Sequence, residues 1–223
     1  MGRWLFEEAQ RGARTGCSVS LAGKFVVTPE GATRICGVTY GSFRERDGFP
    51  FPARETVERD FREIASTGAN AVRTYSVPPR WLLDLAADVG LLVMVGLAWE
   101  SHVAFLDDRN QAAAILTRLR GQLAPIAGHP AILCYAIGNE IPASIVRWHG
   151  RRRVEAFLEE LCWLVRRSDP GALVTYVNYP STEYLQLPFL DLVAFNVYLE
   201  SVDQLGPYLS RLQNLAGDRP LIV

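Results

Sequence analysis

The stretch Ala131-Ile132-Leu133-Cys134-Tyr135-Ala136-Ile137-Gly138-Asn139-Glu140 is an apolar run that stops abruptly on an amide and a carboxylate. The run has the length of a buried strand and is too short for a helix of ordinary length. Barrels of alternating strands and helices place their chemistry at the C-terminal ends of the strands. Asn139 and Glu140 would then lie at an active site, although a carboxylate after a strand can also cap a helix or face solvent.

Composition restricts the possible classes of protein. The chain has 223 residues, 49% of them hydrophobic, and a formal net charge of -1. A chain of this size can bury a large core, and one large domain is the expected number. The near balance of 23 basic and 24 acidic residues gives no positive field for nucleic acid. We therefore expect no nucleic-acid partner.

The cysteine spacing bears on metal binding and redox state, and the N-terminal segment bears on secretion and membrane insertion. The four cysteines, Cys17, Cys36, Cys134 and Cys162, form no CxxC pair, and no histidine lies near them at metal-ligand spacing. We expect reduced thiols, no metal and no cofactor. The charged first residues do not resemble a secretory signal, and no apolar run approaches the roughly 18 uncharged residues that span a bilayer. A cytoplasmic location without a membrane segment is expected.

A repeating order of strands and helices indicates the fold class. Apolar runs of strand length occur at 35–40, 71–75, 91–97, 132–137, 173–178, 192–197 and 221–223. Apolar residues at helical spacing lie between several of them, within 57–65, 112–123 and 154–165. Such alternation predicts a parallel sheet, either doubly wound or closed as a (β/α)₈ barrel. No glycine-rich phosphate loop follows the first strand, which disfavours a nucleotide-binding fold.

Loop lengths favour the barrel. Connections from strand to helix are long, at 41–55, 98–107 and 141–150, whereas the helix-to-strand connection at 67–70 is short. The long loops should therefore gather on one face, and they carry aromatic and carboxylate residues suited to an active face. A turn at Thr28-Pro29-Glu30-Gly31, flanked by 18–27 and 33–38, predicts an N-terminal hairpin. We expect residues 1–34 to pack on the barrel floor and residues 35–223 to form the barrel.

Three motifs, taken in order, resemble the clan A glycoside hydrolases, and most closely the barrel domain of the family 2 β-glycosidases. They are Gly37-Val38-Thr39-Tyr40 on the first strand, Gly68-Ala69-Asn70-Ala71-Val72-Arg73 on the second, and Asn139-Glu140 ending the fourth. Asn196-Val197-Tyr198 matches a tyrosine of the sixth strand. The chain is also similar to glycosidase-like domains that accompany membrane-bound glycosyltransferases. The resemblance covers most of the chain and implies an α/β fold, a TIM barrel incomplete at the C-terminus.

This resemblance implies a retaining glycoside hydrolase that acts on β-linked glycans by double displacement. Glu140 would be the acid/base, and Asn139 would bind the sugar 2-hydroxyl. Arg73 and Tyr198 would hold and orient the nucleophile. Substrate contacts are expected from residues on the loops and strand ends: Tyr40, Tyr75, Trp99, Glu100, His102, Asn178 and Asn196.

One departure from the family pattern concerns the nucleophile. The resemblance places a nucleophilic glutamate at the end of strand seven, and the sequence stops at Val223 inside that strand. We expect a fragment of a longer protein, inactive alone, whose barrel is closed by the remaining chain or by a partner chain. The alternatives are a non-catalytic glycan-binding or scaffolding domain, or a transglycosidase, associated with polysaccharide synthesis. The sequence indicates neither the sugar nor its linkage.

Overall fold

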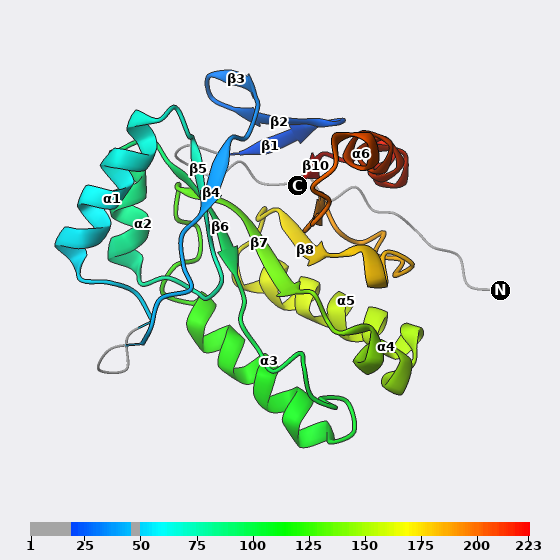
Figure 1. The fold of residues 1–223 in the computed structure, drawn as a ribbon. Helices are drawn as coiled ribbons and strands as arrows, with labels where there is room; N and C mark the ends of the chain where they lie inside the picture. Colours follow the sequence, from blue (N-terminus) through cyan, green and yellow to red (C-terminus); the bar gives the residue numbers. More distant parts are fainter. Residues whose placement is uncertain (1–18, 46–49) are drawn as a thin grey trace.

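The main sheet has seven strands, all parallel. The computed structural model describes residues 19–45 and 50–223. The order across the sheet is β10-β9-β8-β7-β6-β5-β4, and sequence neighbours pair throughout (Figure 1). Their bounds are β4 Gly37–Thr39, β5 Ala71–Thr74, β6 Leu92–Gly96, β7 Ile132–Asn139, β8 Val174–Asn178, β9 Val193–Phe195 and β10 Leu221–Ile222. This order confirms the predicted incomplete (β/α)₈ barrel.

Helices cover the outer side of this sheet. They are α1 Arg54–Ser66, α2 Arg80–Asp88, α3 Arg109–Leu123, α4 Ala143–His149, α5 Arg151–Ser168, the 3-10 helix η1 Pro180–Thr182, and α6 Val202–Ala216. The helical spacings at 57–65, 112–123 and 154–165 fall within α1, α3 and α5. The expected loop at 141–150 differs, because seven of its residues form α4. Asp108 starts α3 by accepting a hydrogen bond from the Asn110 backbone N at 2.8 Å.

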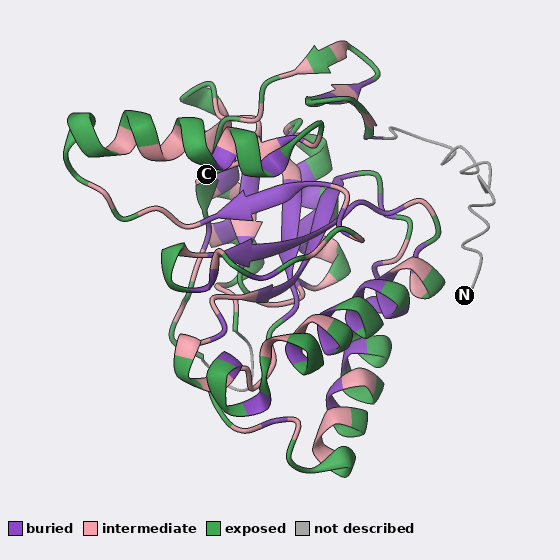
Figure 2. Ribbon diagram, turned by 90° about the vertical axis from the view of Figure 1, so that its right-hand side faces the viewer, coloured by how far each residue is buried: buried purple, intermediate pink, exposed green. Residues whose placement is uncertain are grey.

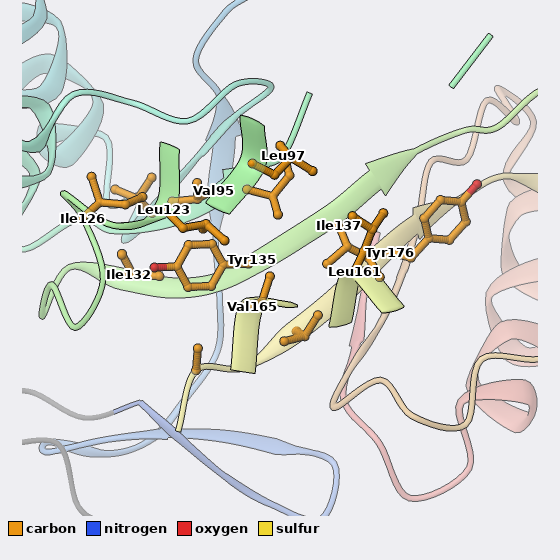
Figure 3. Close-up of a cluster of buried hydrophobic side chains, with 14 of the residues drawn as sticks. Val95, Leu97, Leu123, Ile126, Ile132, Tyr135, Ile137, Leu161, Val165 and Tyr176 are labelled. Carbon is orange, nitrogen blue, oxygen red and sulfur yellow. The ribbon is translucent and has the colours of Figure 1, made fainter. Parts of the chain in front are cut away.

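Alternation along the strands divides the core into two clusters. Val95, Tyr135 and Ile137 point outward and pack under the helices, where Leu161 of α5 meets them (Figure 3). The intervening Met94, Cys134 and Ala136 belong to a second cluster inside the barrel. The central strands β5 to β9 are mostly buried, whereas the helices alternate buried and exposed residues (Figure 2). Both faces of the sheet are therefore apolar, as a parallel sheet requires.

The N-terminal segment forms a small antiparallel sheet of β1 Ser20–Ala22, β2 Phe25–Thr28 and β3 Gly31–Thr33. The predicted strand at 18–27 is thus two strands, because Gly23 turns the chain with a φ of 56°. Val19 and Val26 join the cluster inside the barrel, beside Leu133 and Leu173. The sheet therefore packs at the end of the barrel where β7 and β8 begin. Residues 1–18 of the expected 1–34 segment, including Cys17, lie outside the described residues.

None of the helices in the described part of the chain is long and apolar enough to cross a membrane. Cys36, Cys134 and Cys162 are free thiols, the last two buried. Burial raises the pKa of the Cys134 thiol to about 12 and that of Cys162 to about 11. Both buried thiols are consequently inert packing groups.

Candidate active site

A bulge near the end of β7 brings Asn139 into the barrel. Ala136 pairs with Thr175 and Asn139 with Val177, so that the register shifts by one residue between these pairs. Such a bulge reverses the alternation of side chains beyond it. Ala136 faces the interior, and without the bulge Asn139 would face the helices. With the bulge, its amide meets Arg73 from β5 and Asn196 after β9.

Arg73 and the two asparagines form a hydrogen-bonded group at the C-terminal ends of the strands. Arg73 Nη1 donates to Asn196 Oδ1 at 3.0 Å, and Arg73 Nη2 donates to Asn139 Oδ1 at 2.5 Å. Asn196 Nδ2 donates to the same Asn139 oxygen at 3.1 Å. Three residues that lie 57 to 123 positions apart in the sequence are thereby joined. We call this group the amide cluster.

Glu140 adjoins the amide cluster. Its Oε1 accepts a hydrogen bond from Asn196 Nδ2 at 2.8 Å and another from the Tyr198 hydroxyl at 2.5 Å. Its backbone N donates to Val177 O at 2.9 Å, and its φ of 44° is the single positive value among the described non-glycine residues. A left-handed conformation costs a non-glycine residue about 1–2 kcal/mol. The contacts around Glu140 thus hold its backbone in a conformation that is unfavourable by itself.

Glu140 accepts hydrogen bonds from neutral donors, and the cation of Arg73 is bonded to one of these donors, Asn196. Donation to Glu140 raises the pKa of the largely exposed Tyr198 phenol, because the hydrogen bond favours its protonated form. Burial lowers the pKa of Arg73, although Tyr75 and Glu140 oppose that effect. The Arg73 guanidinium lies 4.9 Å from the centre of the Tyr75 ring. Arg73 therefore stays cationic without forming a direct ion pair with Glu140.

A small open pocket of about 220 Å³ lies against the amide cluster. Its lining includes Arg73, Tyr75, Trp99, Ser101 and Asn139. Two further lining residues are glycines, and a Cβ on Gly96 would lie 2.4 Å from Thr74 O. A Cβ on Gly138 would lie 3.2 Å from the Tyr176 ring. The pocket consequently depends on two positions without side chains.

Several predicted substrate-binding residues have other contacts. Tyr40 is 6% exposed, and its ring packs on Phe61 while its hydroxyl donates to Asp60 at 2.9 Å. The prediction for Tyr40 is wrong because the residue lies on the helix side of the sheet. The amide of Asn178 is also buried, and it bonds to Tyr179 N and to both oxygens of Thr182. Asn178 therefore organises the turn at η1 and has no atom directed at the pocket.

The loop after β6 gives a mixed result. Trp99 lines the pocket, yet its ring packs on Phe105 and its Nε1 donates to Ile137 O at 2.8 Å. Glu100 instead forms two hydrogen bonds of 2.7 Å with Arg118 of α3, which lower the pKa of Glu100. His102 is exposed and lies outside the pocket lining. Arg73, Tyr75, Asn139, Glu140, Asn196 and Tyr198 are the predicted residues that the structure brings together.

Sequence reasoning missed other parts of the site. The Tyr176 hydroxyl accepts a hydrogen bond from Ile141 N at 2.8 Å and so supports the chain just beyond Glu140. Gly96 and Ser101 were also not foreseen. Gly138, directly before Asn139 and Glu140, was the one available signal, since a glycine within a strand often marks a bulge or close approach. In the described part of the chain, no group of three or more His, Cys, Asp or Glu residues could hold a metal ion.

Three solved structures with the same fold illustrate the similarity. The chain is similar to a Bacteroides uniformis β-glucuronidase (18% identity, 90% of this chain and 26% of that chain, TM-score 0.74). It is also similar to a GH2 β-galacturonidase from Eisenbergiella tayi (18%, 92% and 37%, TM-score 0.76). An FMN-binding β-glucuronidase from Facaelibacterium prausnitzii L2-6 is a third (19%, 92% and 32%, TM-score 0.77). The chain thus spans between a quarter and two fifths of their length.

A family model gives the assignment. No curated protein matches the chain. Residues 33–223, which include every residue of the amide cluster and Glu140, match the model described as "Glycosyl hydrolases family 2, TIM barrel domain". The chain therefore belongs to the TIM barrel domain family of the family 2 glycosyl hydrolases.

Proposed function

We propose that this domain carries the acid/base of a retaining β-glycosidase, with Glu140 in that role. The observation that supports it most is that Glu140 Oε1 accepts from two donors, Asn196 and Tyr198, directly after Asn139, which lines the pocket at the C-terminal end of β7. Active sites of barrel enzymes are built at this end. The strained φ of Glu140 agrees with a functional position, since strain of this kind gathers at active sites.

The chemistry assigned to Glu140 has two steps. In the first, its carboxylic acid gives a proton to the glycosidic oxygen while a second carboxylate attacks the anomeric carbon and displaces the leaving group. In the second, the Glu140 carboxylate takes a proton from water as that water attacks the anomeric carbon and releases the second carboxylate. Asn139 borders the pocket and supplies the amide that would bind the sugar 2-hydroxyl.

Arg73 and Tyr198 take part through the contacts that they make. They were expected to orient a nucleophile, and in the described residues they contact the amide cluster and Glu140 instead. Among those residues, no other carboxylate joins this network: Glu100 pairs with Arg118, and Glu183 pairs with Arg211. We propose that the second carboxylate lies beyond Ile222, on the strand that β10 begins. On this basis only the longer protein would hydrolyse a glycoside, and this domain alone would be inactive.

The substrate is proposed to be a β-linked glycoside. The solved structures named above suggest β-glucuronides and β-galacturonides as the first candidates, to be compared with neutral β-glycosides. The full-length protein is expected to release the aglycone from one member of this panel, and proton NMR should show the β-anomer of the sugar as the first product. An initial α-anomer would contradict a retaining mechanism.

Loss of the acid/base supplies the second test. Changing Glu140 to Gln should lower kcat/KM for an alkyl β-glycoside by about 10²–10⁴-fold, the range for a general acid. A protein that binds oligosaccharide, hydrolyses none of the panel, and is unchanged by this substitution would instead be a non-catalytic glycan-binding domain. Transfer of the sugar to an added acceptor in preference to water would identify a transglycosidase.

A further inference from the structure

Asn196 lies between the cation of the site and its carboxylate. We propose that Asn196 is a positioning residue of the reaction, which keeps Oε1 of Glu140 as a hydrogen-bond acceptor and so places the catalytic proton on Oε2. The inference rests on the proposed function, and it changes the part that the sequence assigned to Asn196, which was substrate binding. The inference is based on two hydrogen bonds, one that links Arg73 to Asn196 and one that links Asn196 to Glu140.

The first step of the argument is the orientation of the Asn196 amide. Its Oδ1 accepts from Arg73 Nη1 at 3.0 Å, and its Nδ2 donates to Asn139 Oδ1 and to Glu140 Oε1. Rotating the amide by half a turn would direct its NH₂ group at the guanidinium, which has donors only. It would also place the amide oxygen against two acceptor oxygens. Arg73 therefore fixes which end of Asn196 faces Glu140.

The second step concerns the two oxygens of Glu140. Oε1 receives two donors, Asn196 Nδ2 at 2.8 Å and the Tyr198 hydroxyl at 2.5 Å. Within residues 19–45 and 50–223, no side chain or backbone group donates to Oε2. An oxygen that accepts two hydrogen bonds is a poor place for a proton, whereas the other oxygen can carry one. The acid hydrogen consequently belongs on Oε2, and that oxygen gives it to the glycosidic oxygen.

The third step is the effect on Asn139. Its Oδ1 accepts from both Arg73 and Asn196. Its Nδ2 has no acceptor among the described residues, and Asn139 lines the pocket. The same contacts that direct Asn196 at Glu140 thus leave Asn139 with a free donor for a substrate hydroxyl. Arg73 thus orients both amides, that of Asn196 toward Glu140 and that of Asn139 toward the substrate.

The test exchanges donor for acceptor at position 196 without changing its shape. Asn196→Asp keeps an oxygen for Arg73, but it places a second carboxyl oxygen against Glu140 Oε1. The two groups would then share a proton on the Oε1 side, away from the leaving group. Two β-glycosides of the same sugar are compared in the full-length protein: an alkyl glycoside, whose leaving group needs a proton, and a dinitrophenyl glycoside, whose leaving group does not.

We expect kcat/KM for the alkyl glycoside to fall by about 100-fold or more and that for the dinitrophenyl glycoside by less than about 10-fold, because only the first depends on proton delivery. Asn196→Ala should change the ratio in the same direction. Asn214→Asp, the same exchange at an exposed position of α6, is the control and should change neither value. Equal losses on both substrates, which a purely structural role would cause, would overturn the proposal, and so would no loss on either.

A second readout separates this inference from the proposed function. If the unaltered protein hydrolyses neither glycoside, the proposed function fails, whereas NMR of asparagine side-chain amides tests separately whether Asn196 holds Oε1 of Glu140. The Asn196 signal is the one absent from Asn196→Asp, and it should move in Glu140→Ala because Nδ2 loses its carboxylate acceptor. An unchanged Asn196 signal would overturn the assignment of Asn196 as the residue that holds Oε1.

Discussion

Two glutamates follow neighbouring strands of this barrel, and their surroundings are opposite. Glu100, after β6, is neutralised by Arg118 through two hydrogen bonds of 2.7 Å and turns toward α3. Glu140, after β7, receives its two donors from the neutral side chains of Asn196 and Tyr198. Arg118 lowers the pKa of Glu100, whereas Glu140 contacts no cationic side chain directly among the described residues. Both glutamates lie at strand ends, so their different hydrogen-bonding partners determine their roles.

The largest expected effect compares these two glutamates directly. Glu140→Gln should lower kcat/KM for an alkyl β-glycoside by about 10²–10⁴-fold, while Glu100→Gln should leave it within about 3-fold, because the second residue moves no proton. Steady-state kinetics of both variants in the full-length protein provides the measurement. Equal losses from the two substitutions would remove the distinction drawn between them.

A smaller effect concerns Gly96, one of the two glycines that line the pocket next to Asn139. Gly96→Ala places a Cβ 2.4 Å from Thr74 O and 2.5 Å from Tyr75 O, both backbone atoms that cannot move aside independently. We expect a loss of about 1–3 kcal/mol in the free energy of unfolding, the usual range for overpacking. Urea denaturation measures it. Gly121→Ala, where no atom lies within 4 Å of the new Cβ, is the matched control and should not be destabilising.

The ion pair of Glu100 makes a pH-dependent contribution. Arg118 lowers the pKa of Glu100 in the folded protein, so the pair stabilises the fold above the ordinary glutamate pKa. That contribution is lost as the pH falls through the lowered folded value. The pair is 43–44% exposed, and solvent screening limits it to about 0.2–1 kcal/mol. Denaturation of Glu100→Gln and of the unaltered protein should show a difference that is full at pH 7 and shrinks as the pH falls below the ordinary glutamate pKa.

The smallest effect is spectroscopic and concerns Glu140 itself. Its hydrogen bond raises the pKa of the Tyr198 phenol, because the carboxylate stabilises the protonated hydroxyl. Glu140→Ala should therefore lower the pKa of Tyr198 toward its ordinary value. Carbon-13 NMR of labelled tyrosine, with Tyr198 assigned from Tyr198→Phe, follows this titration. An upward shift would show that Tyr198 does not donate to Glu140.

The sequence predicted the position of the site better than its detailed contacts. Arg73, Asn139, Glu140 and Tyr198 come together because parallel strands bring their C-terminal ends to one edge, and hydrophobic runs reveal those ends. The direction of each side chain was less accessible. Tyr40 follows β4 on the helix side and is buried against Phe61, a result of alternation that depends on strand limits known to within a residue.

The bulge in β7 is the clearest example of what the pattern could not give. It reverses the side-chain alternation before Asn139, and it depends on the pairing of β7 with β8, which lies 35 or more residues further along the chain. The same holds for Asn178, which lies on the outward side of its strand and bonds within its own turn. Local sequence predicts where the strands lie, whereas contacts between distant strands determine which polar groups remain free for substrate.

The central claim is that Glu140 is the acid/base, and rescue by a small anion tests it most directly. In Glu140→Ala, a dinitrophenyl β-glycoside can still form the glycosyl-enzyme because its leaving group needs no proton. Azide, in the space left by the carboxylate, should then attack the anomeric carbon, raise turnover and yield the β-glycosyl azide. No acceleration by azide, or a product of α configuration, would contradict the role given to Glu140.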